Sequence, residues 1–199
     1  MTKLLMIRHA ATSWNRCQRI QGVSDIPIDD AARQEIAGWR VPDAFADAVW
    51  VSSPLGRAME TARLLGGNPE PEQRLTEMNW GEWEGRTLKD LRAELGEPMV
   101  QNENRGIDFR PTGGESPREI QDRLRPWLSE IATAGNDTVA VTHKGVIRAV
   151  MAMATGWNMM GKPPARVLNG SGHRFVVNAD GEPVVHGLNI SLQEGRATL

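Results

Sequence analysis

The sequence has one cysteine, no tyrosine and no long apolar run. With Cys17 alone among 199 residues, an internal disulfide framework and a zinc site made only of cysteines are excluded. No apolar stretch approaches the roughly 20 residues of a membrane span. The N-terminal apolar run is interrupted by charge too early for a secretory signal peptide. We therefore expect a cytoplasmic protein that does not enter a membrane.

Neither sign of charge dominates. Lys and Arg number 23 and Asp and Glu number 25, which gives a net charge of −2. This balance argues against a domain held to nucleic acid by bulk positive charge. The length suits one domain with its own core. We expect a small molecule as the partner and no nucleic acid; the sequence leaves a homodimer open without determining the oligomeric state.

Short apolar segments alternate with helical patterns along the chain. Leu4–Ile7, Ala48–Val51 and Val139–Val141 are typical of strands buried on both faces of a parallel sheet. The patterns that follow them have helical periodicity: about Asp29–Trp39, Pro54–Leu65 and Val146–Ala154. This order predicts an α/β fold, a single-domain three-layer α/β/α sandwich over residues 1–199 with a mostly parallel central sheet.

The remaining segments add a helix, a hairpin and a polar excursion. Ser116 begins a capping box, so we expect a helix from there to about Ile131, kinked at Pro126. Arg174–Asn178 and Pro183–Ile190 predict two strands joined by a turn. Residues 96–116 are rich in polar residues, Gly and Pro and lack periodicity, which indicates a lid-like surface excursion.

Cationic or histidine side chains follow all three buried strands: Arg8 and His9, Arg57, and His143 with Lys144. In open α/β sheets, ligands bind beyond the carboxyl ends of the strands, so these side chains are expected to face one crevice. Helix N-termini predicted at Pro54 and near Gly145 would add backbone N–H groups there. The pattern predicts a phosphate-binding site.

Two of these residues also have a simpler interpretation. Arg57 has the spacing of a solvated helix residue paired with Glu60, and His143 that of a structural histidine at a strand end. The convergence of three strand ends favours the phosphate site. A metal site is not expected, because neither His9 nor His143 has a companion at metal-binding spacing and their cationic neighbours would repel a metal ion.

At this point the residues match a known pattern. The segment Arg8–Asn15, RHAATSWN, resembles the signature of the histidine phosphatase superfamily, in its phosphoglycerate-mutase-like branch. Later blocks of that family are similar to segments that follow in the same order: Arg19–Ile28, Ser52–Ala62, Leu75–Gly85, Gly113–Ser116, Val141–Arg148 and Leu188–Asn189. The resemblance therefore covers nearly the whole chain.

The resemblance implies a set of roles. His9 would be the nucleophile that becomes phosphohistidine, while Arg8, Arg57 and His143 would hold the phosphoryl oxygens. Glu77 would protonate the leaving oxygen and then activate water. Glu82 and Glu84 lie nearby, and spacing alone does not choose among the three; the resemblance selects Glu77. The phosphate pocket would be lined by further residues: Asn15, Gln21 and Gly22. No cofactor and no metal are implied.

Two positions depart from the family pattern. Ala10 replaces a glycine after the nucleophile, and Lys144 follows the second histidine where a small residue is usual. We count Lys144 among the candidate substrate-binding residues, because its amine is placed to meet a second anionic group. The alternatives are that it crowds the pocket or that its flexible stem extends to solvent.

The sequence as a whole predicts a metal-independent phosphomonoester hydrolase of small phosphorylated metabolites. One alternative is a phosphoglycerate mutase. The segment between Glu77 and His143 is short for that enzyme, and Glu77–Gly81 resembles the phosphatase form of its block. The other alternative is a non-catalytic phosphate-ester binding protein. Against it, every residue type that catalysis needs is present.

Overall fold

The strands form one sheet with a parallel centre and an antiparallel edge. In the computed structural model, which describes residues 1–193, the strand order is β3-β2-β4-β1-β5-β6. The first four in that order pair in parallel, and β5 and β6 pair antiparallel. The strands are β1 (Thr2–Arg8), β2 (Val49–Ser52), β3 (Glu70–Pro71), β4 (Thr138–Thr142), β5 (Ser171–Val177) and β6 (Pro183–Ser191). The predicted mostly parallel sheet is confirmed; residues 194–199, included in the predicted domain, lie outside the described residues.

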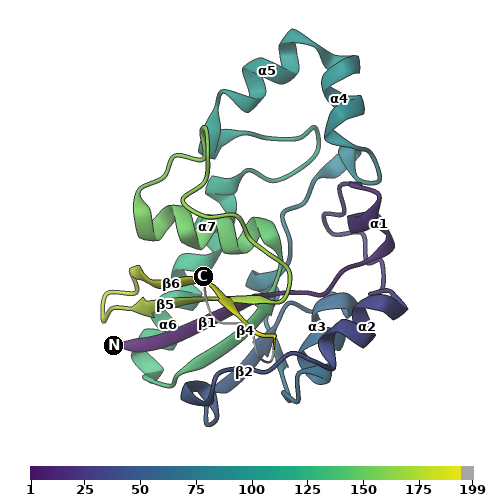
Figure 1. Cartoon of the computed structure of the whole chain (residues 1–199). Helices are drawn as coiled ribbons and strands as arrows, with labels where there is room; N and C mark the ends of the chain where they lie inside the picture. The colour runs from purple at the N-terminus through teal and green to yellow at the C-terminus, as the bar shows by residue number, and fades with distance from the viewer. Residues whose placement is uncertain (194–199) are drawn as a thin grey trace.

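Helices cover both faces of this sheet (Figure 1). The α-helices of the described chain are α1 (Ser13–Arg16), α2 (Asp30–Ile36), α3 (Gly56–Leu64), α4 (Leu88–Leu95), α5 (Glu97–Glu103), α6 (Pro117–Ala134) and α7 (Lys144–Thr155). α2 and α3 pack on one face, and α6 and α7 on the other. Between residues 1 and 193, no helix is long and apolar enough to cross a membrane.

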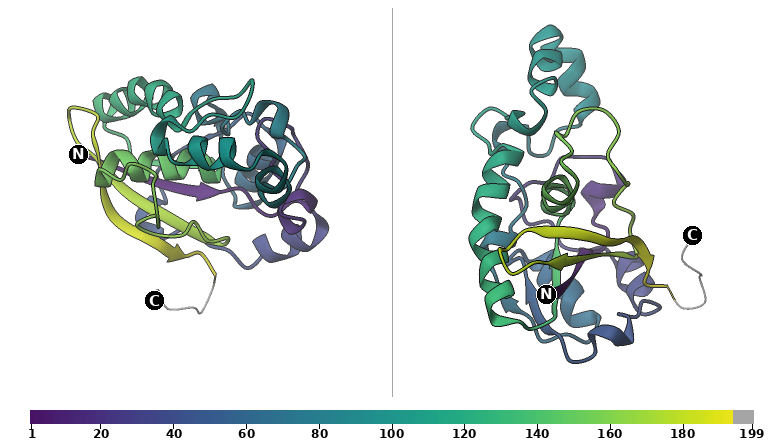
Figure 2. Two further views of the ribbon diagram at one scale, coloured as in Figure 1. Left: turned by 90° about the horizontal axis from the view of Figure 1, so that it is seen from above. Right: turned by 90° about the vertical axis from the view of Figure 1, so that its left-hand side faces the viewer.

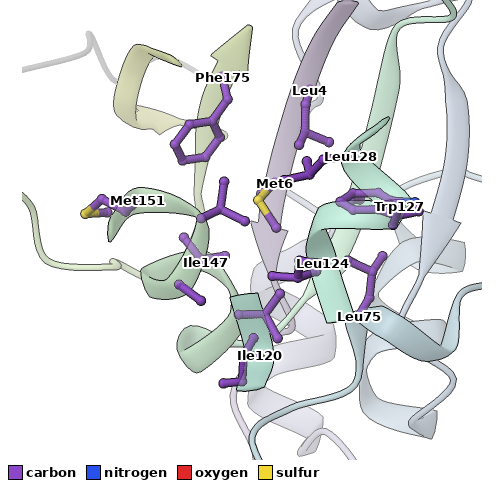
Figure 3. Close-up of a cluster of buried hydrophobic side chains, with 14 of the residues drawn as sticks. Leu4, Met6, Leu75, Ile120, Leu124, Trp127, Leu128, Ile147, Met151 and Phe175 are labelled. Carbon is purple, nitrogen blue, oxygen red and sulfur yellow. The ribbon is translucent and has the colours of Figure 1, made fainter. Parts of the chain in front are cut away.

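β1 shows why the sheet needs two helical layers. Successive side chains of a strand point to opposite faces. Leu4 and Met6 therefore join the core with α6 and α7 (Figure 3), while Leu5 and Ile7 join the core with α2 and α3. Full burial of each such side chain stabilises the fold by about 1.5–3 kcal/mol. A strand that is apolar at every position can therefore bury all its side chains only in the middle layer of a sandwich.

Two local predictions around the second strand are wrong. Val49 is 45% exposed, so β2 is not buried on both faces; it lies beside the two-residue edge strand β3. The following helix begins at Gly56 rather than Pro54. The reason is a cap supplied from elsewhere in the chain: the backbone N–H groups of Gly56 and Arg57 donate to the carboxylate of Asp25.

Other predicted elements hold. Asp29 caps α2, and the capping box at Ser116 begins α6, which continues past Pro126 as one helix to Ala134. The predicted C-terminal hairpin is the antiparallel pair β5 and β6. These signals were readable because each cap or turn depends on residues that are neighbours in the sequence.

The excursion predicted at 96–116 contains helical structure and begins earlier. α4 and α5, separated by Gly96 with a positive φ of 56°, form an arm that projects beyond the sheet (Figures 1 and 2). A small core holds the arm to the body; its buried members are Ile20, Trp83, Leu91 and Met99. The sequence signal for α4 is the N-cap Thr87 followed by leucines at helical spacing. A lid function for the arm remains a prediction.

Candidate active site

The parallel strands bring the predicted residues to one edge of the sheet. Arg8 ends β1, His9 follows it, and the backbone N–H of His9 donates to the Thr142 carbonyl at the end of β4 at 2.8 Å. His143 comes next in the chain and precedes α7. The ring centroids of His9 and His143 lie 5.1 Å apart. The predicted convergence of the first and third strand ends is confirmed.

A cavity of about 760 Å³ lies at this edge, and we call it the cationic cavity. Most of the predicted site residues line it: Arg8, His9, Asn15, Gln21, Gly22, Arg57, Glu77 and Lys144. His143 is fully buried and is not part of the wall. The cationic side chains of the lining are Arg8, Arg16, Arg19, Arg57, Lys89, Arg92, Lys144 and Arg148. Among the described lining residues Glu77 is the single carboxylate, so the cavity attracts anions.

His9 is held as a neutral imidazole with one nitrogen available. Its Nδ1 lies 2.7 Å from the carbonyl oxygen of Ala10. Because a carbonyl only accepts hydrogen bonds, Nδ1 carries the proton in this contact and Nε2 keeps its lone pair. Burial, followed by repulsion from Arg8 and Arg57, lowers the pKa of His9 well below its usual value. The side chain therefore has the form that a nucleophile needs.

His143 is a second buried imidazole with an unused nitrogen. Its Nε2 contacts the Ser53 hydroxyl at 2.7 Å, while its buried Nδ1 has no hydrogen-bond partner within residues 1–193. Burial is the main cause that lowers the pKa of His143, and the positive charges of Arg57 and Arg8 add to it. An unpaired polar atom in such a position is costly unless a ligand satisfies it.

Arg57 is fully buried, which overturns the reading of a solvated helix residue paired with Glu60. Its Nη2 donates to the Gly22 carbonyl at 2.7 Å, and its Nη1 donates to the Ser24 carbonyl at 2.8 Å. Its buried Nε has no partner in the described part of the chain, and the same is true of Arg8 Nε. Burial lowers the pKa of both guanidinium groups, yet arginine stays charged in proteins. A buried and a half-buried cation with unused N–H groups suit a phosphoryl group.

The loop that positions Arg57 is itself held by Glu84. The Glu84 carboxylate accepts from the backbone N–H groups of Val23 and Ser24, each at 2.9 Å. Gly22 has a positive φ of 55°, and a Cβ there would overlap Glu84 Oε1, so only glycine fits. The sequence analysis did not predict this role of Glu84. The two residues involved, Gly22 and Glu84, lie about 60 positions apart, and no local pattern links them. Glu82, by contrast, is exposed.

Glu77 lies at the N-terminus of α7. Its Oε1 accepts from the N–H groups of Met78 at 2.9 Å and Gly145 at 3.1 Å, and a Cβ on Gly145 would overlap the same oxygen. Its charge acts on Arg8 and Arg57. The prediction that the helix N-termini offer free N–H groups to a ligand is wrong in part, because Glu77 occupies Gly145 N–H and Asp25 occupies Gly56 N–H.

The polar rim of the cavity contains Asn15, Gln21 and Lys144. Asn15 accepts from Thr12 N–H at 3.1 Å and donates to Gln21 Oε1 at 3.1 Å, so the two amides orient each other. Lys144 is exposed at the rim. Partial burial and repulsion from Arg8 and Arg148 lower the pKa of its amine. The binding roles of these residues remain predictions.

The described residues contain no group of side chains suited to a metal ion. Between positions 1 and 193, no three His, Cys, Asp or Glu side chains are grouped so that they could hold a metal ion. The charge of a bound anion would be neutralised by arginine and lysine side chains instead. Independence from metals remains a prediction for activity measurements.

The site combines two buried histidines, the buried Arg57 and the half-buried Arg8 at one edge of a three-layer α/β sandwich, an arrangement that suits a phosphoryl group. The chain belongs to the histidine phosphatase superfamily (branch 1), whose family model matches residues 4–191. This confirms the resemblance seen in the sequence.

Individual relatives include both phosphatases and mutases. A glucosyl-3-phosphoglycerate phosphatase from Mycolicibacterium vanbaalenii is 33% identical, over 91% of this chain and 88% of the relative. A 2,3-bisphosphoglycerate-dependent phosphoglycerate mutase 2 from Gloeobacter violaceus is 31% identical, over 76% and 74%. Among solved structures, a phosphoserine phosphatase from Entamoeba histolytica in complex with 3-phosphoglyceric acid superposes with a TM-score of 0.79 at 25% identity, covering 96% of this chain and 98% of that one.

Proposed function

We propose that this protein is a phosphomonoester hydrolase of small phosphorylated metabolites that acts through a phosphohistidine on His9. The observation that carries the proposal is the neutral, buried His9, with Nε2 unprotonated, in the wall of a cavity with eight cationic side chains and one carboxylate. The relatives named as phosphatases support it. Its location in the cytoplasm remains a prediction from the sequence.

In the first half-reaction, His9 Nε2 attacks phosphorus. A P–N bond forms, the bond from phosphorus to the leaving oxygen breaks, and Glu77, which first takes up a proton from solvent, gives that proton to the leaving oxygen. Arg8 and Arg57, with His143 behind them, stabilise the charge on the non-bridging oxygens. Because Arg57 and His143 are fully buried and already oriented, they need little rearrangement when the charge develops.

In the second half-reaction, Glu77 acts as a base. Its carboxylate removes a proton from a water molecule, whose oxygen attacks phosphorus and breaks the P–N bond. Inorganic phosphate leaves, and His9 returns to its neutral form with Nδ1 still directed at the Ala10 carbonyl. Glu77 is again protonated and ready for the next ester.

Phosphoglycerate mutase activity is the second candidate, because a relative of 31% identity carries that name. The chemistry of the first half-reaction would be the same, and the phosphohistidine would pass its phosphoryl group to a second hydroxyl instead of to water. The short segment between Glu77 and His143 favours hydrolysis.

The test is phosphate release from a panel of phosphomonoesters, with and without excess EDTA. We expect release that EDTA does not change, and trapping of labelled phosphate on the protein. His9→Ala should abolish both, whereas His186→Ala, at an exposed position of β6, should abolish neither. Full activity of His9→Ala would overturn the mechanism. Interconversion of phosphoglycerates without net phosphate release would favour the mutase.

A further inference from the structure

A second cavity, of about 410 Å³, opens beside the cationic cavity. We call it the distal cavity. Its lining shares several residues with that of the cationic cavity: Trp80, Leu88, Arg92, Gly145 and Arg148. The two cavities are therefore adjacent and meet at these five residues.

Eight of the fifteen residues that line the distal cavity have apolar side chains. They come from five separate segments of the chain: Met78, Trp80, Leu88, Phe109, Pro117, Ile120, Met159 and Met160. The rings of Trp80 and Phe109 meet edge to face with centroids 5.6 Å apart. Small-molecule sites typically combine such walls with a few polar groups, and methionines adapt to ligands of varied shape.

The arm and the segment after α7 lie side by side (Figures 1 and 2). Both contribute residues to the wall of the distal cavity. At Gly106, which has a positive φ of 58°, a Cβ would overlap the carbonyl oxygen of Asn158. Segments about 50 residues apart in the sequence therefore touch along this wall. The cavity is thus a product of the tertiary fold and not of a single loop.

Two of the three charged side chains that line the distal cavity pair with each other. Arg92 forms an ion pair with Glu103 at 2.7 Å. Arg148 lies at the boundary with the cationic cavity, its guanidinium 5.0 Å from the centre of the Trp157 ring. Its buried Nε has no hydrogen-bond partner among the described residues. The distal cavity thus has two cationic side chains and one carboxylate, against eight and one in the cationic cavity, so the positive charge decreases from the cationic cavity into the distal cavity.

We propose that the distal cavity binds the apolar body of the substrate's alcohol, so that the substrate class is phosphomonoesters of alcohols with an aliphatic or aromatic body. The inference rests on the proposed phosphatase function of the same site. Burial of one methylene group contributes about fourfold to an equilibrium or rate constant. The cavity therefore predicts a gain in kcat/KM of that order for each methylene until it is filled.

The n-alkyl phosphates from ethyl to hexyl provide the experiment, because their leaving oxygens have nearly the same basicity and only the apolar body changes. We expect kcat/KM to rise about two- to fourfold per methylene and then to level off. 3-Phosphoglycerate serves as the polar comparison. A flat or falling series, measured with an enzyme that hydrolyses its esters, overturns the inference and leaves the phosphatase function standing.

Binding of the matching alkylphosphonates, measured by calorimetry, tests the cavity without turnover. If no ester is hydrolysed, the proposed function fails, while a phosphonate series that tightens with chain length still supports the cavity. A series of constant affinity overturns the inference independently of catalysis.

One variant pair locates the effect. Met160 lines the distal cavity and is 46% exposed; Val100 lies on α5 outside the lining with the same exposed fraction. Met160→Glu should remove most of the gain from ethyl to hexyl in both series, because it brings a charge to the apolar wall. Val100→Glu should keep the wild-type slope. An unchanged slope in Met160→Glu would place the apolar body elsewhere.

Discussion

The two ends of the active site are built differently. At the phosphate end, His9, Arg57 and His143 are buried and come from strand ends or from the helix turn that follows one. At the leaving-group end, the distal cavity is lined by the arm, short loops and the segment after α7, with side chains as exposed as Met160, together with residues of α6 and α7. The sheet thus fixes the chemistry, while surface segments shape the space for the rest of the substrate. Surface segments can change without moving the sheet, so specificity is free to vary around a constant reaction.

The largest effect that tests this division is expected at Glu77, which lies between the two ends. Glu77→Gln should lower kcat by about 10²–10⁴, the range of general acid–base catalysis. The loss should be larger for ethyl phosphate than for p-nitrophenyl phosphate, because a poor leaving group depends more on a proton donor. Steady-state rates for both esters provide the measurement.

Glu82→Gln is the matched control for Glu77→Gln, since Glu82 is exposed and does not line the cationic cavity. It should leave both rates near wild type. Equal losses for the two leaving groups in Glu77→Gln would show that Glu77 acts by position or charge alone. Glu77 would then not be the proton donor to the leaving group.

The second largest effect is expected on the free energy of unfolding, at a histidine of the sheet. His173 on β5 is fully buried, its Nε2 has no partner within residues 1–193, and burial lowers its pKa to about 4. In the unfolded chain its pKa is about 6.5. Between these values the unfolded state binds more protons, so the free energy of unfolding falls as the pH falls from 6.5 to 4. From pH 7 to 4.5 this histidine should account for about 2 kcal/mol of the loss.

Urea unfolding of His173→Leu at pH 7 and 4.5 checks this expectation. The variant should lose about 2 kcal/mol less than the wild type over that range. His186→Leu, at an exposed position of β6, should behave like the wild type. A wild-type slope for His173→Leu would mean that the proton uptake of acid unfolding occurs at other groups.

The smallest effect is expected at Glu84, which follows Glu77 in the chain but serves the phosphate end. Glu84→Gln places an amide group beside the N–H groups of Val23 and Ser24 and weakens the loop that holds Arg57. We expect kcat/KM to fall about tenfold, the equivalent of weakening one charge-assisted hydrogen bond. The fall should be the same for ethyl and p-nitrophenyl phosphate, and the Kd of inorganic phosphate should rise in parallel.

Leaving-group dependence separates this positioning role from that of Glu77. A loss in Glu84→Gln that grows with leaving-group basicity would identify Glu84 as the proton donor instead. Glu82→Gln again supplies the control, now for a charge change in the same short segment.

An element could be predicted from the sequence where the residues that determine it are close together in the chain. β1 and β4 were readable because a strand in the middle layer is apolar at nearly every position. α5 was not predicted, because residues 96–116 are polar and the helix follows Gly96 and has a proline in its first turn. The start of α3 was misplaced because its cap, Asp25, lies 31 residues from Gly56.

The sequence alone determined the residue types of the site: two histidines, two arginines and a glutamate, each next to a readable strand or helix. It also determined the order of the strands along the chain, and hence the edge where those residues meet. The tertiary structure alone decided that Glu84 holds the Arg57 loop, that Glu77 occupies the α7 N-terminus, and that the arm and the segment after α7 enclose an apolar cavity. The physical reason is distance along the chain, because caps, periodicity and motifs act between near neighbours, whereas cavities and carboxylate contacts form between segments that only folding brings together.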